Sequence, residues 1–230
     1  NRKSKVLFSS SALPAASWGH QAAGISKSSM KTIENDALSC TGVGKGRCHF
    51  SALIVYFGEF STPYARILKE LCEAWFRILK GTLELEVISY LELNDAWSKA
   101  KQAIISPTRL WLHKVKGILS NLIYTLASLS WKPVSIDFWI DDQQNLWKLN
   151  LLDSPKQIIT QLISSYNSQQ AKLASKHING IGMEKNVDWK VTLALIHSLK
   201  GKDDYAFRSA LEAIISGSTW SNARIHEVNA

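Results

Sequence analysis

The spacing of the apolar residues constrains this chain most, because it is helical along almost the whole length. The clearest example begins at Pro63, which suits the first turn of a helix, with Ser61 or Thr62 as the cap. Apolar residues then recur every three or four positions until Gly81, which is expected to end the helix. This broad apolar stripe predicts a helix that packs against other helices.

The same spacing returns in several other segments. Pro107 breaks one pattern, and Thr108 is a suitable cap for the next helix. The expected helices cover about residues 26–38, 63–80, 82–105, 109–130, 154–177, 189–199 and 204–217. The pair Asn94-Asp95 is a potential break in the third helix. The expected apolar stripe of the fourth helix is Leu112, Val115, Leu119, Leu122 and Leu126.

The period changes from 3.6 to 2 after Pro133. Apolar and polar residues alternate from Val134 to Phe138, and extended structure resumes at Leu146 after the polar run DDQQN. The expected anchors of this β-hairpin are Phe138, Trp139, Leu146 and Trp147. The predicted fold class is therefore mostly α, an irregular helical domain of about six to seven helices with one β-hairpin near residues 134–150.

Composition indicates an ordinary globular chain that can bury a core. It has 230 residues, of which 46% are hydrophobic, and nine Trp rings that are expected to anchor cores or an interface. We expect four consecutive segments. They are a basic N-terminal segment with a Gly-rich loop (1–58), a helical bundle (59–132), the hairpin (133–150) and a C-terminal helical subdomain (151–230).

A basic block without acidic residues is the main candidate for a binding surface. Residues 98–116 contain five Lys or Arg and no Asp or Glu, in a chain of net charge +8. Trp97 and Trp111 lie beside these cations, a combination typical of nucleic-acid contact. The expected contact residues are Arg109, His113, Lys114 and Lys116, with Lys99 and Lys101 as secondary ones. In the expected helix, Arg109, His113, Lys116 and Ser120 share one face. Solvated helix faces are the alternative interpretation.

Several other chemistries have no support in the sequence. Cys40, Cys48 and Cys72 form no CxxC pair, so we expect thiols of a reducing, intracellular compartment, nuclear or cytoplasmic, and no metal site. Gly42 to Lys45 lacks the spacing of a P-loop, and no GxSxG or HExxH motif occurs. No apolar stretch approaches the roughly 20 residues of a membrane span. We therefore expect no cofactor, no membrane partner and no catalytic residue.

The stretch FWIDD at residues 138–142 matches the aromatic-x-Asp-Asp turn of reverse transcriptases. In those enzymes a further Asp from an earlier strand completes a site for two metal ions. Here every upstream segment is predicted to be helical, and the polar run QQN follows the two Asp residues. A solvent-exposed turn is the favoured interpretation, since Asp, Asn and Gln suit such turns. A divergent Mg²⁺-dependent polymerase core is the third functional hypothesis.

The chain resembles a different part of reverse transcriptases. Its opening, VLFSSSALPAASWGHQAAGISKSSMKTI, resembles the stretch after the palm in non-LTR retrotransposon reverse transcriptases, and DFWIDDQQNLWKL resembles their Trp-rich hairpin. NGIGMEKNVDW and AFRSALEAIISGSTW resemble later segments, the second of which precedes a zinc knuckle in those proteins. The resemblance spans nearly the whole chain. Neither a palm nor a cysteine-pair knuckle is present, so no catalytic residue carries over.

The resemblance implies a non-catalytic, thumb-like or connecting fragment of a retroelement protein. Its parent protein would be an RNA-directed DNA polymerase, and its partners would be template–primer nucleic acid and the rest of the polyprotein. The principal alternative is a free-standing helical module that binds a protein partner through Trp-bearing faces. A contiguous basic stripe on the surface favours nucleic acid, whereas dispersed charge beside an exposed Trp patch favours a protein.

Overall fold

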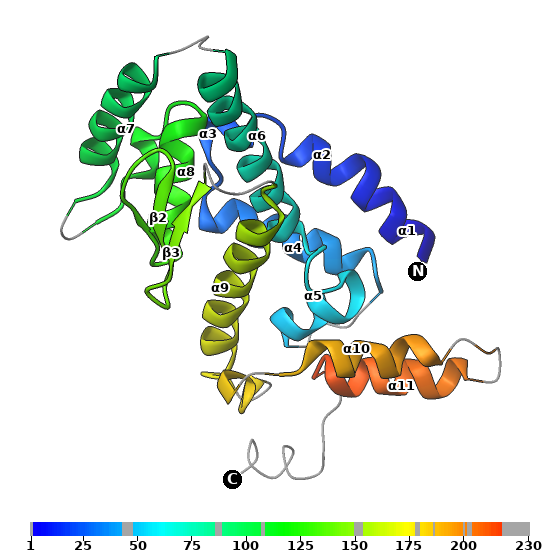
Figure 1. Cartoon of the computed structure of the whole chain (residues 1–230). Coiled ribbons are helices and arrows are strands. Elements are labelled where there is room, and N and C mark those ends of the chain that lie inside the picture. Colours follow the sequence, from blue (N-terminus) through cyan, green and yellow to red (C-terminus); the bar gives the residue numbers. More distant parts are fainter. Residues whose placement is uncertain are drawn as a thin grey trace. The chain divides into compact units, whose positions relative to one another are not determined.

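The computed structural model describes residues 2–42, 48–85, 89–106, 109–149, 154–177, 180–185, 187–199, 201 and 204–217. Their fold is mostly α-helical with one small antiparallel sheet (Figure 1), which confirms the predicted fold class. None of the described helices is long and apolar enough to cross a membrane. The Gly-rich residues 43–47, the Pro107-Thr108 break and Asp153 lie outside the described residues.

Contacts between residues divide the chain into two compact units. Unit 1 contains Asn1–Leu13, Thr32–Pro63 and Asn167–Ala230, and unit 2 contains Pro14–Lys31 and Tyr64–Tyr166. The helices α2 (Leu13–Ala16), α4 (Lys27–Ser39), α6 (Pro63–Leu85) and α9 (Lys156–Ala174) each contribute residues to both units. The four consecutive segments expected from the sequence stay a prediction.

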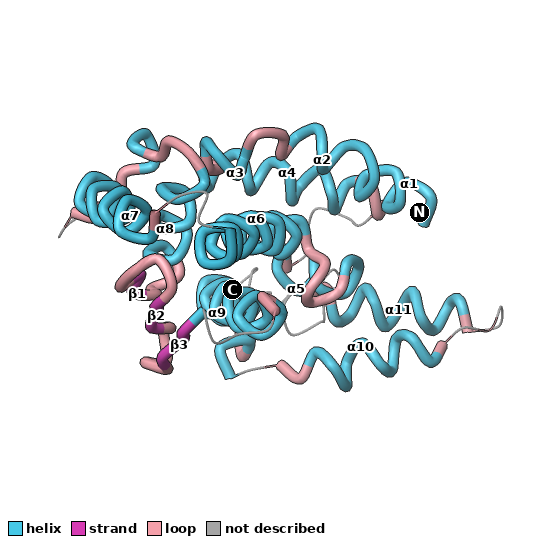
Figure 2. Tube along the Cα trace, turned by 45° about the horizontal axis from the view of Figure 1, so that its top comes forward, coloured by secondary structure: helices cyan, strands magenta, loops and turns pink. Residues whose placement is uncertain are grey.

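Unit 1 is built on α5, a helix that is apolar on nearly all sides. Its other elements are α1 (Arg2–Leu7), the π-helical η1 (Phe8–Ala12), the 3-10 turn η5 (Met183–Lys185), α10 (Trp189–Ser198) and α11 (Tyr205–Ile215); α5 itself is His49–Phe57. Such a helix must be covered by neighbours, and Phe50 packs edge-to-face on Trp189 with ring centroids 6.0 Å apart. The helices α10 and α11 lie side by side (Figures 1 and 2). Asp188 caps α10, since its side chain accepts a hydrogen bond from the Val191 amide at 3.0 Å.

Unit 2 contains a core of tryptophan rings. Its further elements are α3 (His20–Ala23), α7 (Tyr90–Ile104), the 3-10 turn η2 (Leu112–Lys114), α8 (Ile118–Ser128), β1 (Lys132–Pro133), β2 (Phe138–Ile140) and β3 (Leu146–Lys148). Trp75 of α6 and Trp97 of α7 pack with ring centroids 5.4 Å apart, and both are almost fully buried. The Trp75 indole N–H also donates to the Ile136 carbonyl at 3.1 Å, which ties α6 to the start of the hairpin.

The hairpin consists of β2 and β3, with β1 paired antiparallel on the other side of β2 (Figure 2). Trp139 stands opposite Trp147 in the register, and Trp139 is completely buried. Leu146 is 65% exposed, so its expected role as an anchor is wrong. Side chains alternate across a strand, and the burial of Trp147 rather than its neighbours leaves Leu146 on the solvent side.

The predicted solvent-exposed turn is wrong for Asp141. Its carboxylate is fully buried and accepts hydrogen bonds from the backbone amides of Gln143 and Asn145, at 2.9 and 2.8 Å. Side-chain donors complete the set, from Asn145 at 2.9 Å, Trp147 at 3.1 Å and Gln161 at 3.4 Å. A buried carboxylate is tolerated where donors surround it, and here it organises the turn between β2 and β3.

Two helix boundaries differ from the expected ones. The helix α6 continues through Gly81 to Leu85. A glycine inside a helix costs only about 1 kcal/mol relative to alanine, and the buried Leu79 and Thr82 on either side hold the helix in place. The helix α7 begins at Tyr90 instead of Thr82, after a capping box between Ser89 and Glu92, and it passes the Asn94-Asp95 pair without a break.

The helix expected over residues 109–130 is confirmed in its second half and wrong in its first half. Only Ile118–Ser128 forms a helix, α8, while residues 109–117 form an extended strand-like stretch and the turn η2. Gly117, with φ near +90°, separates the two. The apolar pattern still marks the buried side, because Val115, Leu122 and Leu126 are all buried. Arg109, His113 and Lys116 therefore do not share the face of a helix.

Candidate nucleic-acid interface

Residues 109–116, which include Arg109, His113, Lys114 and Lys116, form a segment that folds back along the end of α7. The Ser106 and Arg109 backbones exchange hydrogen bonds at 3.0 and 3.3 Å, and the Trp111 amide donates to the Ile104 carbonyl at 3.1 Å. Ile105 and Leu110 form an isolated antiparallel bridge. A helix starting at Arg109 would use the Arg109 carbonyl to bind the His113 amide, but this carbonyl accepts from Ser106 instead, and residues 109–111 are extended.

Residues 109–111 are extended, so the side chains of Arg109 and Trp111 lie on the same side, and His113 follows in the turn η2. The Arg109 guanidinium lies over the Trp111 ring, 4.5 Å from its centroid. His113 packs its ring edge-on against the same indole, with centroids 5.2 Å apart and an interplanar angle of 84°. Arg109 and His113 are exposed and Trp111 is half-buried. The three side chains form a row that we call the Arg-Trp-His ladder.

In the turn η2 and the residues after it, apolar side chains face the core and basic side chains face solvent. Leu112 packs against the unit 2 core and Val115 is buried within it. His113, Lys114 and Lys116 are exposed. The apolar pair anchors the segment, and the cations point outward between and after the anchors.

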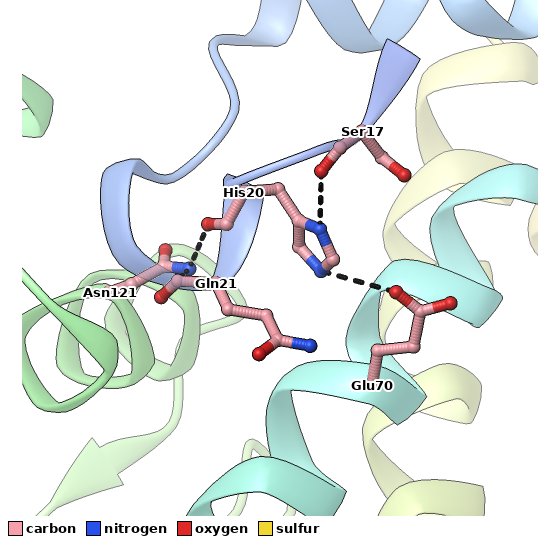
Figure 3. Close-up of polar contacts among 5 residues, drawn as sticks. All are labelled: Ser17, His20, Gln21, Glu70 and Asn121. Carbon is pink, nitrogen blue, oxygen red and sulfur yellow. Dashed lines mark hydrogen bonds and ion pairs between the residues drawn. The ribbon is translucent and has the colours of Figure 1, made fainter. Parts of the chain in front are cut away.

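The helix α3 is hydrogen-bonded to the residues that follow this segment, and Figure 3 shows its contact with Asn121 of α8. The Gly117 amide donates to the Ala22 carbonyl at 2.7 Å. The Asn121 side-chain amide donates to the carbonyls of His20 and Gln21, at 2.8 and 3.2 Å (Figure 3). The short helix α3 is therefore bonded to both the end of the basic segment and the first turns of α8.

The two secondary candidates, Lys99 and Lys101, are not brought onto the ladder. Both belong to α7, and two positions on a helix differ by about 200° in direction. The Lys99 ammonium pairs with Asp95 at 2.6 Å. Lys101 is half-buried. The structure thus brings together Arg109, His113, Lys114 and Lys116 on one short segment.

Local charge is entirely positive along the sequence around this segment. No acidic residue occurs between Asp95 and Asp137, a stretch that also includes Lys132. An anion approaching the ladder meets no carboxylate from this stretch, and the field of the cations adds up.

The ladder was not predicted from the sequence, although the spacing of its three residues is compatible with it. Arg109, Trp111 and His113 follow a period of two, but the same residues were placed in a helix because the apolar stripe continues on both sides. The support from α3 had no signal in the sequence, since it joins residues far apart in the chain.

The described residues contain no cluster of side chains that could bind a metal ion. No group of three or more His, Cys, Asp or Glu side chains there could hold a metal ion. Asp142, the second acid of FWIDD, accepts a hydrogen bond from Ser165, which also accepts one from the Trp131 indole at 2.9 Å. Both aspartates of the motif are thus engaged in the packing of the hairpin against α9.

Comparison of the chain with protein-family models, with curated protein sequences and with solved structures gave no match.

Proposed function

We propose that this chain is a non-catalytic helical module that contacts nucleic acid through residues 109–116. The observation that carries the proposal is the Arg-Trp-His ladder, an exposed guanidinium held over an indole and followed by two exposed lysines. The resemblance to the region beyond the catalytic core of retroelement reverse transcriptases supports the same proposal, because that region would lie beside template and primer.

The ladder suits phosphate binding because Trp111 holds the Arg109 guanidinium in place before a phosphate binds. Stacking of an exposed guanidinium on an aromatic ring contributes about 0.5–1 kcal/mol. Arg109 keeps its planar N–H groups free to form paired hydrogen bonds with phosphate oxygens, which a flexible lysine cannot do. Lys114 and Lys116 add point charges at the end of the same segment.

The proposal is tested by measuring the affinity for a labelled DNA duplex at several salt concentrations. If Arg109, Lys114 and Lys116 each neutralise one phosphate, the plot of log K against log salt has a slope of about −2.7. The triple variant R109Q/K114Q/K116Q is expected to lose most of the affinity and nearly all of the slope.

A matched control removes the same charge from elsewhere in unit 2. Lys132, Lys148 and Lys156 are exposed and lie outside the segment. The variant K132Q/K148Q/K156Q is expected to keep the wild-type slope to within about one contact. A flat salt dependence for the wild type, or equal losses in both triple variants, contradicts the proposal.

A second candidate function is a protein-interaction module, and one observation favours it. The adjacent helices α10 and α11 leave large apolar side chains exposed, namely Val191, Leu195, Phe207 and Ile214. Large exposed apolar side chains on adjacent helices are candidates for a protein contact. Sedimentation of the wild type and of F207E over a range of concentrations tests whether this surface associates; an unchanged monomer in both speaks against self-association.

A further inference from the structure

We infer that His20 and Glu70 form a proton-dependent brace that positions the nucleic-acid segment through α3. The inference rests on the proposed function for the segment itself, and it adds a means of regulation. Figure 3 draws the group, with His20 between the Ser17 carbonyl and the Glu70 carboxylate.

The His20 ring is buried and faces hydrogen-bond acceptors on both sides. Its Nδ1 lies 2.7 Å from the Ser17 carbonyl oxygen, which only accepts, so Nδ1 carries a proton and donates it. Its Nε2 lies 3.7 Å from Glu70 Oε2 (Figure 3). In the neutral ring Nε2 then holds a lone pair that faces a carboxylate, and no hydrogen-bond partner reaches this buried atom.

A second proton on the ring removes this conflict. Nε2–H of the imidazolium donates to the Glu70 carboxylate, and both ring nitrogens are then satisfied. The other groups around the ring do not compete for this proton, since Asn121 of α8 is neutral and donates to backbone carbonyls. Arg66, Glu73 and Arg77, at four before, three after and seven after Glu70, are the other charged groups on that side of α6. Glu73 pairs with Lys69 at 3.8 Å, and Arg77 Nε donates to the Glu73 carbonyl at 3.3 Å.

The brace is connected directly to the basic segment. The carbonyl of His20 accepts from Asn121, and Ala22 in the same short helix accepts from the Gly117 amide, the residue that follows Lys116. A helix of one turn has little stability of its own, so its position depends on such contacts. Closing the pair with Glu70 therefore holds the end of the segment more firmly.

The first measurement is the hydrogen-exchange protection of the Gly117 amide in the whole chain without nucleic acid. Histidine changes charge between about pH 5 and pH 8. Protection is expected to be roughly fivefold higher at about pH 5 than at about pH 8, the size of effect that a partly exposed charged pair gives.

The variant E70Q is the decisive one. A glutamine amide can donate to the neutral Nε2, so Gly117 protection is expected to become high and independent of pH. The matched control E73Q removes a glutamate of the same helix that pairs with Lys69, and it is expected to keep the wild-type pH profile. The same pH profile in E70Q and the wild type overturns the inference.

The ring nitrogens give a second readout that needs no variant. Their ¹⁵N chemical shifts at about pH 8 are expected to report a proton on Nδ1 and a lone pair on Nε2. A ring with its neutral proton on Nε2 overturns the inference, because Nε2 would then donate to Glu70 at every pH.

Binding completes the test and separates the two proposals. The affinity for the labelled duplex is measured against pH in an H113N background, which removes the histidine of the segment itself. The brace predicts a residual rise in affinity at low pH that E70Q abolishes. Absence of duplex binding by the wild type at every pH contradicts the proposed function, while the Gly117 profile still decides whether the brace exists. A pH dependence of binding that is the same with and without E70Q contradicts the coupling between them.

Discussion

At the scale of single residues, Asp141 shows how a buried charge can be used to build a turn. Burial by itself raises the pKa of this carboxyl, but the hydrogen bonds from Asn145, Trp147 and Gln143 outweigh it, and the pKa lies below its ordinary value of 3.8. A pKa lowered by folding means that the charged form favours the folded state. Its contribution is complete above the pKa of the unfolded chain and is lost as the pH falls through the folded value.

This residue gives a prediction for stability. The variant D141N removes the charge and turns an amide N–H₂ toward side-chain donors, leaving buried donors without an acceptor. The expected loss is about 2–3 kcal/mol of unfolding free energy at neutral pH. Urea unfolding at about pH 7 and at about pH 3 measures it, and the difference between D141N and the wild type is expected to shrink at the lower pH.

The neighbouring aspartate provides the comparison. Asp142 is half-buried and takes one hydrogen bond, from Ser165. D142N is expected to cost less than D141N, because an asparagine can still accept that bond. Equal losses in the two variants would contradict the role given to Asp141.

At the scale of elements, the position of α3 depends on Gly24, which ends it. Gly24 has φ +70° and ψ 177°, a conformation that only glycine adopts readily. A β-carbon at this position would lie 3.0 Å from Leu112 Cδ1 and 3.2 Å from Asn121 Oδ1. The lack of a side chain thus allows α3 to approach the basic segment and α8.

The variant G24A is predicted to disturb the segment as well as the stability. Gly58 ends α5 with a similar backbone, φ 88° and ψ 151°, but a β-carbon there meets nothing within 4 Å. G58A therefore measures the backbone strain alone, about 1–3 kcal/mol. G24A is expected to lose more and also to lose exchange protection at Gly117. Equal losses with Gly117 protection retained would show that the close approach is unimportant.

The element that the sequence analysis misplaced is explained at this scale too. The apolar stripe from Leu112 to Leu126 identifies the buried side correctly, and it is compatible with a helix throughout. The extended start is selected by pairing with the end of α7 and by the positive φ of Gly117. Backbone pairing with residues 104–106 overrides the local helical preference here, as context often does.

At the scale of the whole molecule, the described residues include two separate clusters of buried side chains. One, in unit 2, includes Ile123 and the tryptophan rings; the other, in unit 1, includes Ile54, Phe50 and Trp189. Ile54 and Ile123 are both completely buried. They share no cluster, so their contributions to stability are expected to be independent.

Conservative variants test this independence. I54V and I123V each remove one buried methyl group, and each is expected to cost about 0.5–1.5 kcal/mol. The double variant is expected to lose the sum of the two to within about 0.5 kcal/mol. Denaturant unfolding of the four proteins measures it, and a larger deviation would mean that the two cores are coupled.

The sequence by itself determined the helical class, the single β-hairpin and most of the buried positions. These follow from the period of the apolar residues, which is a local property and does not depend on how the helices pack together. The burial of the hairpin anchor Trp139 was predicted for the same reason.

Only the tertiary structure decided what the polar residues do. Asp141 lies in a turn by its sequence, but its burial depends on Gln161 from α9 and on the facing indole of Trp147. His20 meets Glu70, and Arg109 lies over Trp111, because separate segments fix the backbone at these points. A polar group takes its role from the donors, acceptors and charges around it, and the pattern of apolar residues does not reveal which of these lie close in space.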